Sequence, residues 1–145
     1  MSVQEEKRAT DNVRKVDYFY TTVPNTAGQG AKILAGLAAE GVNLLAFSGF
    51  PSGRRAQLDL VPEDSAALKR AAKKLGIELS PRKIAFLVQG EDRVGAMTDL
   101  FDALANAKIS VTAADAVSTG EGRFGCIFWV KPEAVAKAAK LVRAR

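Results

Sequence analysis

The sequence predicts an α+β fold built from two βαββαβ units in tandem, each an antiparallel sheet with its helices on one face. Strand-like and helix-like segments occur twice along the chain in the same order. In both halves a glycine, Gly28 or Gly95, ends the loop between the first strand and the first helix. These glycines are 67 residues apart (95 minus 28), and the same offset relates Phe19 to Phe86. The matching order and spacing indicate an internal repeat.

The first unit is expected at residues 15–80, after a polar segment, 1–14, that lacks apolar periodicity and is expected to form a flexible tail. Strands are expected where β-formers cluster or where polar and apolar residues alternate, at 15–23, 42–47, 56–61 and 77–79. Helices are expected where apolar residues recur on one face, at 31–40 and 62–75. Pro62 suits the first turn of the second helix, and a glycine follows each helix.

The second unit is expected at residues 81–145, because the pattern restarts after Ser80-Pro81. The expected elements are a strand at 84–88, a helix through 97–105, a hairpin turn at 118–122, a strand at 126–130 and a helix at 132–142. No later segment matches 77–79, so this unit is expected to lack its last strand. Its sheet is also apolar on both faces, and such edges and faces are normally covered. We therefore expect the two units to pack on each other and the chain to form a homodimer.

The composition excludes several kinds of site. The chain has no histidine, and its single cysteine, Cys126, lies in an apolar run. A metal site or histidine-dependent catalysis is therefore not expected, and we predict neither enzyme activity nor a cofactor. No signal sequence and no run long enough to span a membrane is present, which predicts a cytoplasmic protein. The net charge of +5 is spread along the chain, so nucleic acid is not the expected partner.

The loops that end at Gly28 and Gly95 are the candidate binding sites. Each precedes a helix, whose first N–H groups have no partner within the helix and attract anions. Loop N–H groups suit the carboxylate of a free amino acid, and side-chain oxygens suit its ammonium group. The candidate ligand-binding residues are Asn25, Thr26, Ala27, Gly28 and Asn43 in the first unit, and Asp92, Arg93, Val94, Gly95 and Ser110 in the second. Alternatively, the glycines only turn the chain and the polar residues only cap the helices.

These motifs resemble those of ACT domains, which are small ligand-sensing modules often appended to enzymes of amino-acid metabolism. The resemblance covers residues 15–145, and the segments that show it are Val23–Gly28, Gly41–Leu45, Glu91–Gly95 and Lys108–Val111. The chain departs from the family pattern at Thr26-Ala27, at Lys108 and at Ser110. The resemblance implies two ferredoxin-like units that hold an amino acid or similar metabolite near their interface. It also implies a regulatory role, with an enzyme or another regulator as partner.

Two alternative functions remain open. RNA-binding RRM domains share the βαββαβ order, and Arg123–Trp129 superficially resembles their RNP1 strand. This segment lacks the glycine after its basic residue and has Cys126 where a stacking aromatic is needed. The other alternative is a structural dimerisation module that has lost its ligand.

Overall fold

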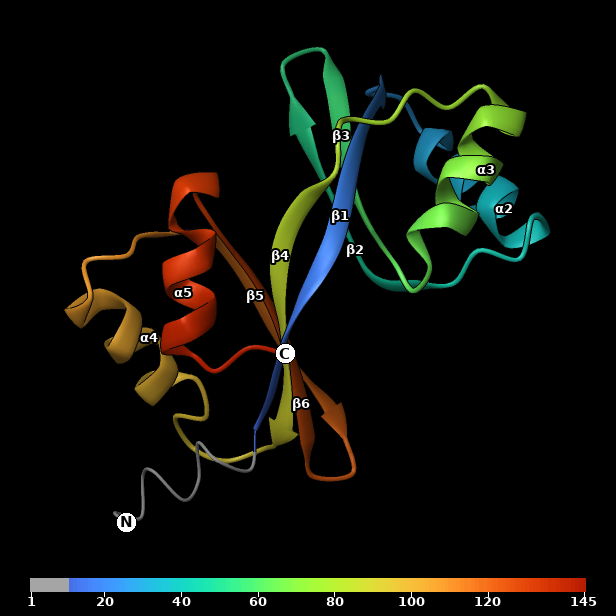
Figure 1. Ribbon diagram of the computed structural model, residues 1–145. Coiled ribbons are helices and arrows are strands. Elements are labelled where there is room, and N and C mark those ends of the chain that lie inside the picture. Colours follow the sequence, from blue (N-terminus) through green and yellow to red (C-terminus); the bar gives the residue numbers. More distant parts are fainter. Residues whose placement is uncertain (1–10) are drawn as a thin grey trace. The chain divides into compact units, whose positions relative to one another are not determined.

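The computed structural model describes residues 11–145, which form two compact units. The first unit covers residues 17–83, and the second covers residues 84–145 together with residues 11–16. Strand β1 (Asn12–Pro24) is continuous and contributes residues to both units (Figure 1). Most of the expected N-terminal tail, residues 1–10, lies outside the described residues.

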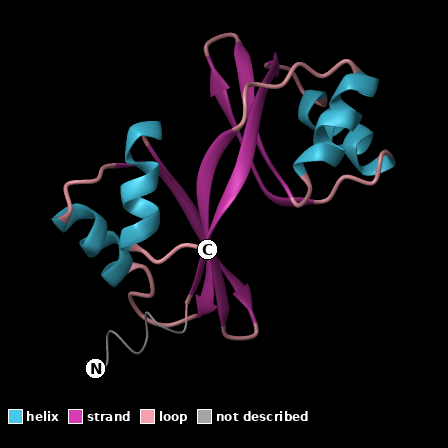
Figure 2. Cartoon of the chain, viewed as in Figure 1, coloured by secondary structure: helices cyan, strands magenta, loops and turns pink. Residues whose placement is uncertain are grey.

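The first unit is an antiparallel sheet with two helices on one face (Figure 2). Its strands have the order β2–β3–β1. Besides β1, its elements are α2 (Gln29–Ala39), β2 (Leu44–Ser52), β3 (Arg55–Pro62) and α3 (Ser65–Leu75). Leu37 of α2 and Leu68 of α3 pack with Phe19 and Leu60 of the sheet, and this cluster is the core of the unit.

The second unit repeats this arrangement. Its elements are β4 (Lys83–Glu91), α4 (Thr98–Asn106), β5 (Val111–Gly120), β6 (Arg123–Val130), the 3₁₀ turn η1 (Pro132–Ala134) and α5 (Val135–Leu141). The strands are antiparallel in the order β4–β6–β5. Phe86 of β4 stacks on Phe128 of β6 with ring centroids 5.0 Å apart. Leu104 of α4 and Ala138 of α5 pack against these rings, so the helices again cover one face.

The start of β1 provides the edge strand that the second unit was expected to lack. β1 is hydrogen-bonded to β4, and its residues Asn12–Val16 belong to the second unit. Val13 is buried in the core of that unit. The Lys15 N–H donates to the Arg145 carbonyl, and the Arg145 N–H donates to the Val13 carbonyl, both at 3.0 Å. The prediction that Asn12–Arg14 form a tail is therefore wrong, because these residues pair with segments distant in sequence.

The predicted strand at residues 77–79 is not formed. The Ser80 N–H donates to the Tyr20 carbonyl at 2.8 Å, whereas the Tyr20 N–H donates to the Ser80 hydroxyl at 2.9 Å. A side chain thus replaces the backbone acceptor that a ladder needs. Pro81 follows and has no N–H, so the ladder cannot continue there. Ile77 and Leu79 still pack against the core of the first unit.

The second helix of the first unit begins later than predicted. Pro62 ends β3 instead of opening the helix. The Asp64 carboxylate accepts hydrogen bonds from the N–H groups of Ala66 and Ala67 at 3.0 and 3.2 Å. An aspartate cap of this kind satisfies two otherwise unpaired N–H groups, and it places the start of α3 at Ser65.

Candidate functional site

The loop at Asn25–Gly28 joins β1 to α2 and is exposed along its length. The Asn25 N–H donates to the Arg54 carbonyl at 3.3 Å, which ties the loop to the turn between β2 and β3. Gly28 has φ of 90°, a left-handed conformation that favours glycine, and it turns the chain into the helix. Within residues 11–145, the N–H groups of Ala27 and Gly28 have no hydrogen-bond partner. These two donors are available to a ligand.

The N-terminus of α2 has no compensating negative charge. Its cap, Gly28, has no side chain, and the first turn contains no acidic residue. The side chains of Asn25 and Thr26 are exposed and make no hydrogen bond to residues 11–145. The exposed side chain of Arg54 also has no partner within that range. Arg54 is not among the residues predicted from the sequence, and its place in the turn beside the end of β1 is the feature that identifies it.

Asn43 does not lie near this loop in its own unit. Its side-chain amide donates to the Glu63 carboxylate at 2.8 Å, and its backbone carbonyl accepts from the Glu63 N–H at 2.9 Å. The loop follows Pro24, which pairs with Arg55, whereas Leu44 pairs with Pro62. Arg55 and Pro62 are seven residue steps apart along β3 (62 minus 55), which corresponds to about 23 Å. Asn43 therefore lies away from the loop of its own unit, and its role in ligand binding stays a prediction.

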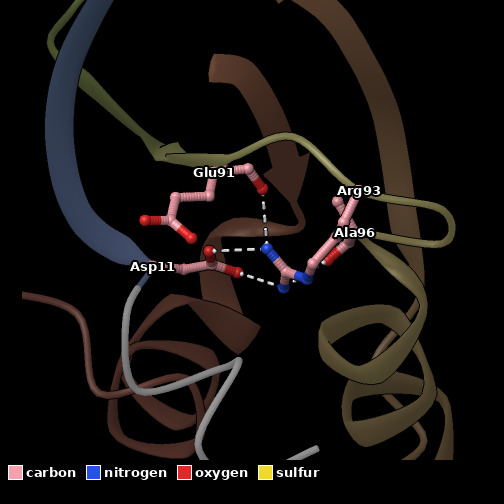
Figure 3. A network of polar contacts seen from close by, with 4 residues as sticks. All are labelled: Asp11, Glu91, Arg93 and Ala96. Carbon is pink, nitrogen blue, oxygen red and sulfur yellow. Dashed lines mark hydrogen bonds and ion pairs between the residues drawn. The ribbon is translucent and has the colours of Figure 1, made fainter. Parts of the chain in front are cut away.

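The corresponding loop of the second unit is closed by its own arginine (Figure 3). The Arg93 guanidinium donates to the carbonyls of Glu91 and Ala96 at 2.8 and 3.2 Å. It also donates two hydrogen bonds to the Asp11 carboxylate, at 3.1 and 3.0 Å. The hydrogen bonding of Arg93 to the Asp11 carboxylate raises the pKa of Arg93 above its usual value. The cation predicted to meet a ligand is already paired within the chain.

The other predicted residues of this loop, Asp92, Val94 and Gly95, are all exposed. The Asp92 N–H donates to the Gly122 carbonyl at 2.8 Å, and its side chain is exposed. Val94 points fully into solvent, and Gly95 has φ of 70°. Asp99 supplies negative charge in the first turn of α4. The helix end is therefore less attractive to an anion than the uncapped end of α2.

Ser110 immediately precedes β5 and lies far from the Asp92–Gly95 loop. Glu91 pairs with Arg123 at one end of β6, and Val111 pairs with Val130 at the other. The seven residue steps from Arg123 to Val130 (130 minus 123) again correspond to about 23 Å. The structure thus separates Ser110 from the loop of its own unit, as it separates Asn43.

The described residues contain few groups suited to other chemistry. Residues 11–145 include no cluster of acidic or cysteine side chains able to hold a metal. Burial, with a smaller contribution from Asp115, raises the pKa of Cys126 to about 11, so its thiol stays protonated at neutral pH. Phe124 and Phe128 lie in the core, so they cannot stack on RNA bases. None of the described helices combines the length and apolar character needed to cross a membrane.

Comparisons with known proteins identify the fold. No protein-family model matches the sequence, and no curated protein matches it. Protein BT0572 from Bacteroides thetaiotaomicron matches the structure with a TM-score of 0.77 and 13% identity, over 91% of this chain and 89% of that one. The regulatory subunit of aspartate kinase from Thermus thermophilus matches with a TM-score of 0.61 and 17% identity, over 92% and 94% of the two chains.

The chain has the fold of an aspartate kinase regulatory subunit. The corresponding subunit from Thermus flavus gives a TM-score of 0.55 at 18% identity, over 92% of this chain and 93% of that one. These matches are consistent with the α+β, ferredoxin-like fold that the loop motifs implied. At such low identity the similarity shows the fold alone.

Proposed function

We propose that this chain is a regulatory protein that binds a small carboxylate metabolite, a free amino acid in the simplest case, at Asn25–Gly28. The observation that supports the proposal most directly is the pair of free N–H groups at Ala27 and Gly28, at the uncapped start of α2. Two such donors beside a helix N-terminus suit a carboxylate. In the equivalent loop of the second unit, Asp11 already pairs with Arg93, and Asp99 adds a negative charge to the first turn of α4, which favours the Asn25–Gly28 loop for an anion.

Each part of an amino acid has a suitable group at this loop. The carboxylate accepts from the N–H groups of Ala27 and Gly28, and the charge of Arg54 adds attraction. The side-chain oxygens of Asn25 and Thr26 are free to accept from the ammonium group. The fold similarity to regulatory subunits of a kinase supports a regulatory role over a catalytic one. The proposed role is therefore regulatory and includes no enzyme activity.

We also propose that the chain acts as a homodimer, with a partner enzyme or regulator as its target. Nine of the ten residues of β5 are exposed, and this strand is an edge of its sheet. Exposed edges are frequent sites of pairing with another chain. Sedimentation equilibrium with and without the ligand measures the mass directly. A mass of one chain under both conditions contradicts the dimer but leaves the ligand site unaffected.

Thermal unfolding with each standard L-amino acid in turn tests the ligand. A ligand present at about a hundred times its dissociation constant stabilises the fold by roughly 2.7 kcal/mol. In a chain of this size the midpoint rises by about 3–6 °C. A selective rise with one or two amino acids is the expected result. The absence of any rise contradicts an amino-acid ligand and favours the structural dimerisation module.

A matched pair of variants tests the location. Ala31→Glu places a carboxylate in the exposed first turn of α2, where it stabilises the helix and repels an anionic ligand. Thr98→Glu places a glutamate at the equivalent position of α4, 67 residues later (98 minus 31). We expect Ala31→Glu to weaken binding and Thr98→Glu to leave it unchanged. Equal effects of both variants would place the ligand elsewhere.

A further inference from the structure

A shallow groove lies beside the C-terminal end of α4 in the second unit. Its volume is about 480 Å³, within the range of small-molecule sites. The lining residues are Phe101, Ala105, Lys108, Ile109, Ser110 and Val111. They come from the last two turns of α4 and from the segment that leads into β5. The groove is thus at the end of the unit opposite the Asp92–Gly95 loop.

Lys108 has an unusual backbone conformation. Its φ is 60°, a left-handed conformation in which non-glycine residues are disfavoured. The equivalent residue of the first unit is Gly41, with φ of 74°. Both residues end a helix in the same way: the Gly41 N–H donates to Ala38 and the Lys108 N–H donates to Ala105, at 3.0 and 2.9 Å. The second unit thus has a lysine where the turn itself favours glycine.

The groove combines a positive charge with an apolar wall. Within residues 11–145, the Lys108 ammonium and the Ser110 hydroxyl have no hydrogen-bond partner. The Lys137 ammonium donates to the carbonyl of Ala107 at 3.1 Å, so a second cation lies next to Lys108 in the fold. None of the lining residues is acidic. Phe101 packs edge-on against Phe128 of the core, with ring centroids 5.8 Å apart, which holds the apolar wall in place.

We propose that this groove binds a small organic carboxylate with a short apolar tail. The Lys108 ammonium and the Ser110 hydroxyl donate to the carboxylate oxygens, and the tail lies along Phe101 and Val111. The left-handed backbone at Lys108 turns the chain from the end of α4 into the segment that contains Ser110. The site does not depend on the Asn25–Gly28 loop, since it uses residues of the other unit only.

A titration of the full chain followed by ¹⁵N NMR tests the proposal. The probe is 3-phenylpropionate, and its neutral isostere 3-phenylpropionamide is the matched control. We expect saturable shifts of the amide signals of Ala105, Ile109 and Ser110 with the carboxylate, and much weaker binding of the amide. Lys108→Gln lowers the affinity for the carboxylate about fivefold or more, because it removes a charged donor. Lys140→Gln, a change of the same kind outside the lining, leaves it unaltered.

Three results would overturn the proposal: equal binding of the acid and the amide, no effect of Lys108→Gln, or carboxylate shifts confined to Asn25–Gly28. The last result supports the loop site and rejects the groove, so the two proposals fail separately. Lys108→Gly provides a second variant without the charge, and its backbone suits the left-handed conformation. If this folded variant still binds the acid with unchanged affinity, the lysine has no part in recognition.

Discussion

The Asp11 carboxylate accepts two hydrogen bonds from the Arg93 guanidinium, 82 positions later in the sequence. The pair is well shielded, with 5% of the Asp11 side chain and 18% of the Arg93 side chain exposed. It joins the residue before β1 to the loop between β4 and α4. Because β1 is the edge strand of the second unit, the ion pair anchors the start of that strand.

Asp11→Asn is expected to lower the free energy of unfolding by about 2 kcal/mol, because it leaves the Arg93 guanidinium shielded without a countercharge. Arg82→Gln is the control, since it breaks the Arg82–Asp17 pair, whose side chains are 60% and 29% exposed. Its expected effect is below about 0.5 kcal/mol. Urea unfolding measures both. Similar losses in the two variants would contradict an anchoring role for Asp11.

Gly90→Ala is expected to destabilise the second unit by about 2 kcal/mol. A Cβ at this position would lie 2.2 Å from the Asp11 carboxylate and 2.9 Å from the Phe124 ring. Gly125 on the neighbouring strand is the control, because the nearest atom to an added Cβ there, the Val88 carbonyl oxygen, would be 3.9 Å away. Gly125→Ala should change the stability little. In an Asp11→Ala background the loss caused by Gly90→Ala should shrink, and an unchanged loss would show that the clash does not involve Asp11.

Lys108→Gly is expected to raise the free energy of unfolding by up to about 1 kcal/mol, because it relieves the left-handed strain. Gly41→Ala introduces the same strain in the first unit and should lower the free energy of unfolding by a similar amount. Both positions end a helix with the same backbone hydrogen bonds, so the comparison isolates the residue type. Chemical unfolding of the two variants measures the difference. A loss of stability in Lys108→Gly would show that the lysine side chain stabilises the fold.

Cys126 is expected to make the fold less stable at alkaline pH. Burial raises its pKa from 9.0 to about 11, so the folded chain keeps the thiol proton to a higher pH than the unfolded chain does. Stability from this group is therefore complete below pH 9 and is lost as the pH rises through 11. Urea unfolding from pH 8 to pH 10.5 compares the wild type with Cys126→Ala. The decline should be shallower in the variant, and parallel declines would contradict this assignment.

The order of elements could be predicted because it depends on local patterns. The alternation at 56–61 and the glycines at Gly28 and Gly95 correspond to β3 and to two loops with left-handed glycines. The start of β1 could not be predicted in this way. Asn12–Arg14 have no strong strand preference, and their conformation depends on pairing with β4 and with Arg145.

The geometry of the candidate site depends on pairing that the sequence does not show. The sequence predicted the loop that contains Ala27 and Gly28, whereas their free N–H groups are a feature of the structure. The occupation of Arg93 by Asp11 was hidden, because a sequence does not show which carboxylate meets which guanidinium. Lys108 was noted only as a departure from a family pattern, and its strain becomes visible only through its backbone angles. Local patterns identify loops, whereas long-range pairing decides which of their groups stay free.

The two-part contribution of β1 has a consequence for synthesis on the ribosome. Residues 17–83 are contiguous, so the first unit can fold as soon as they have emerged. The second unit needs Val13 to meet Arg145, which is 132 positions later (145 minus 13). Closing so long a loop is slow. A nascent chain should therefore contain a folded first unit before Asn12–Val16 pair with Arg145 and complete the second unit.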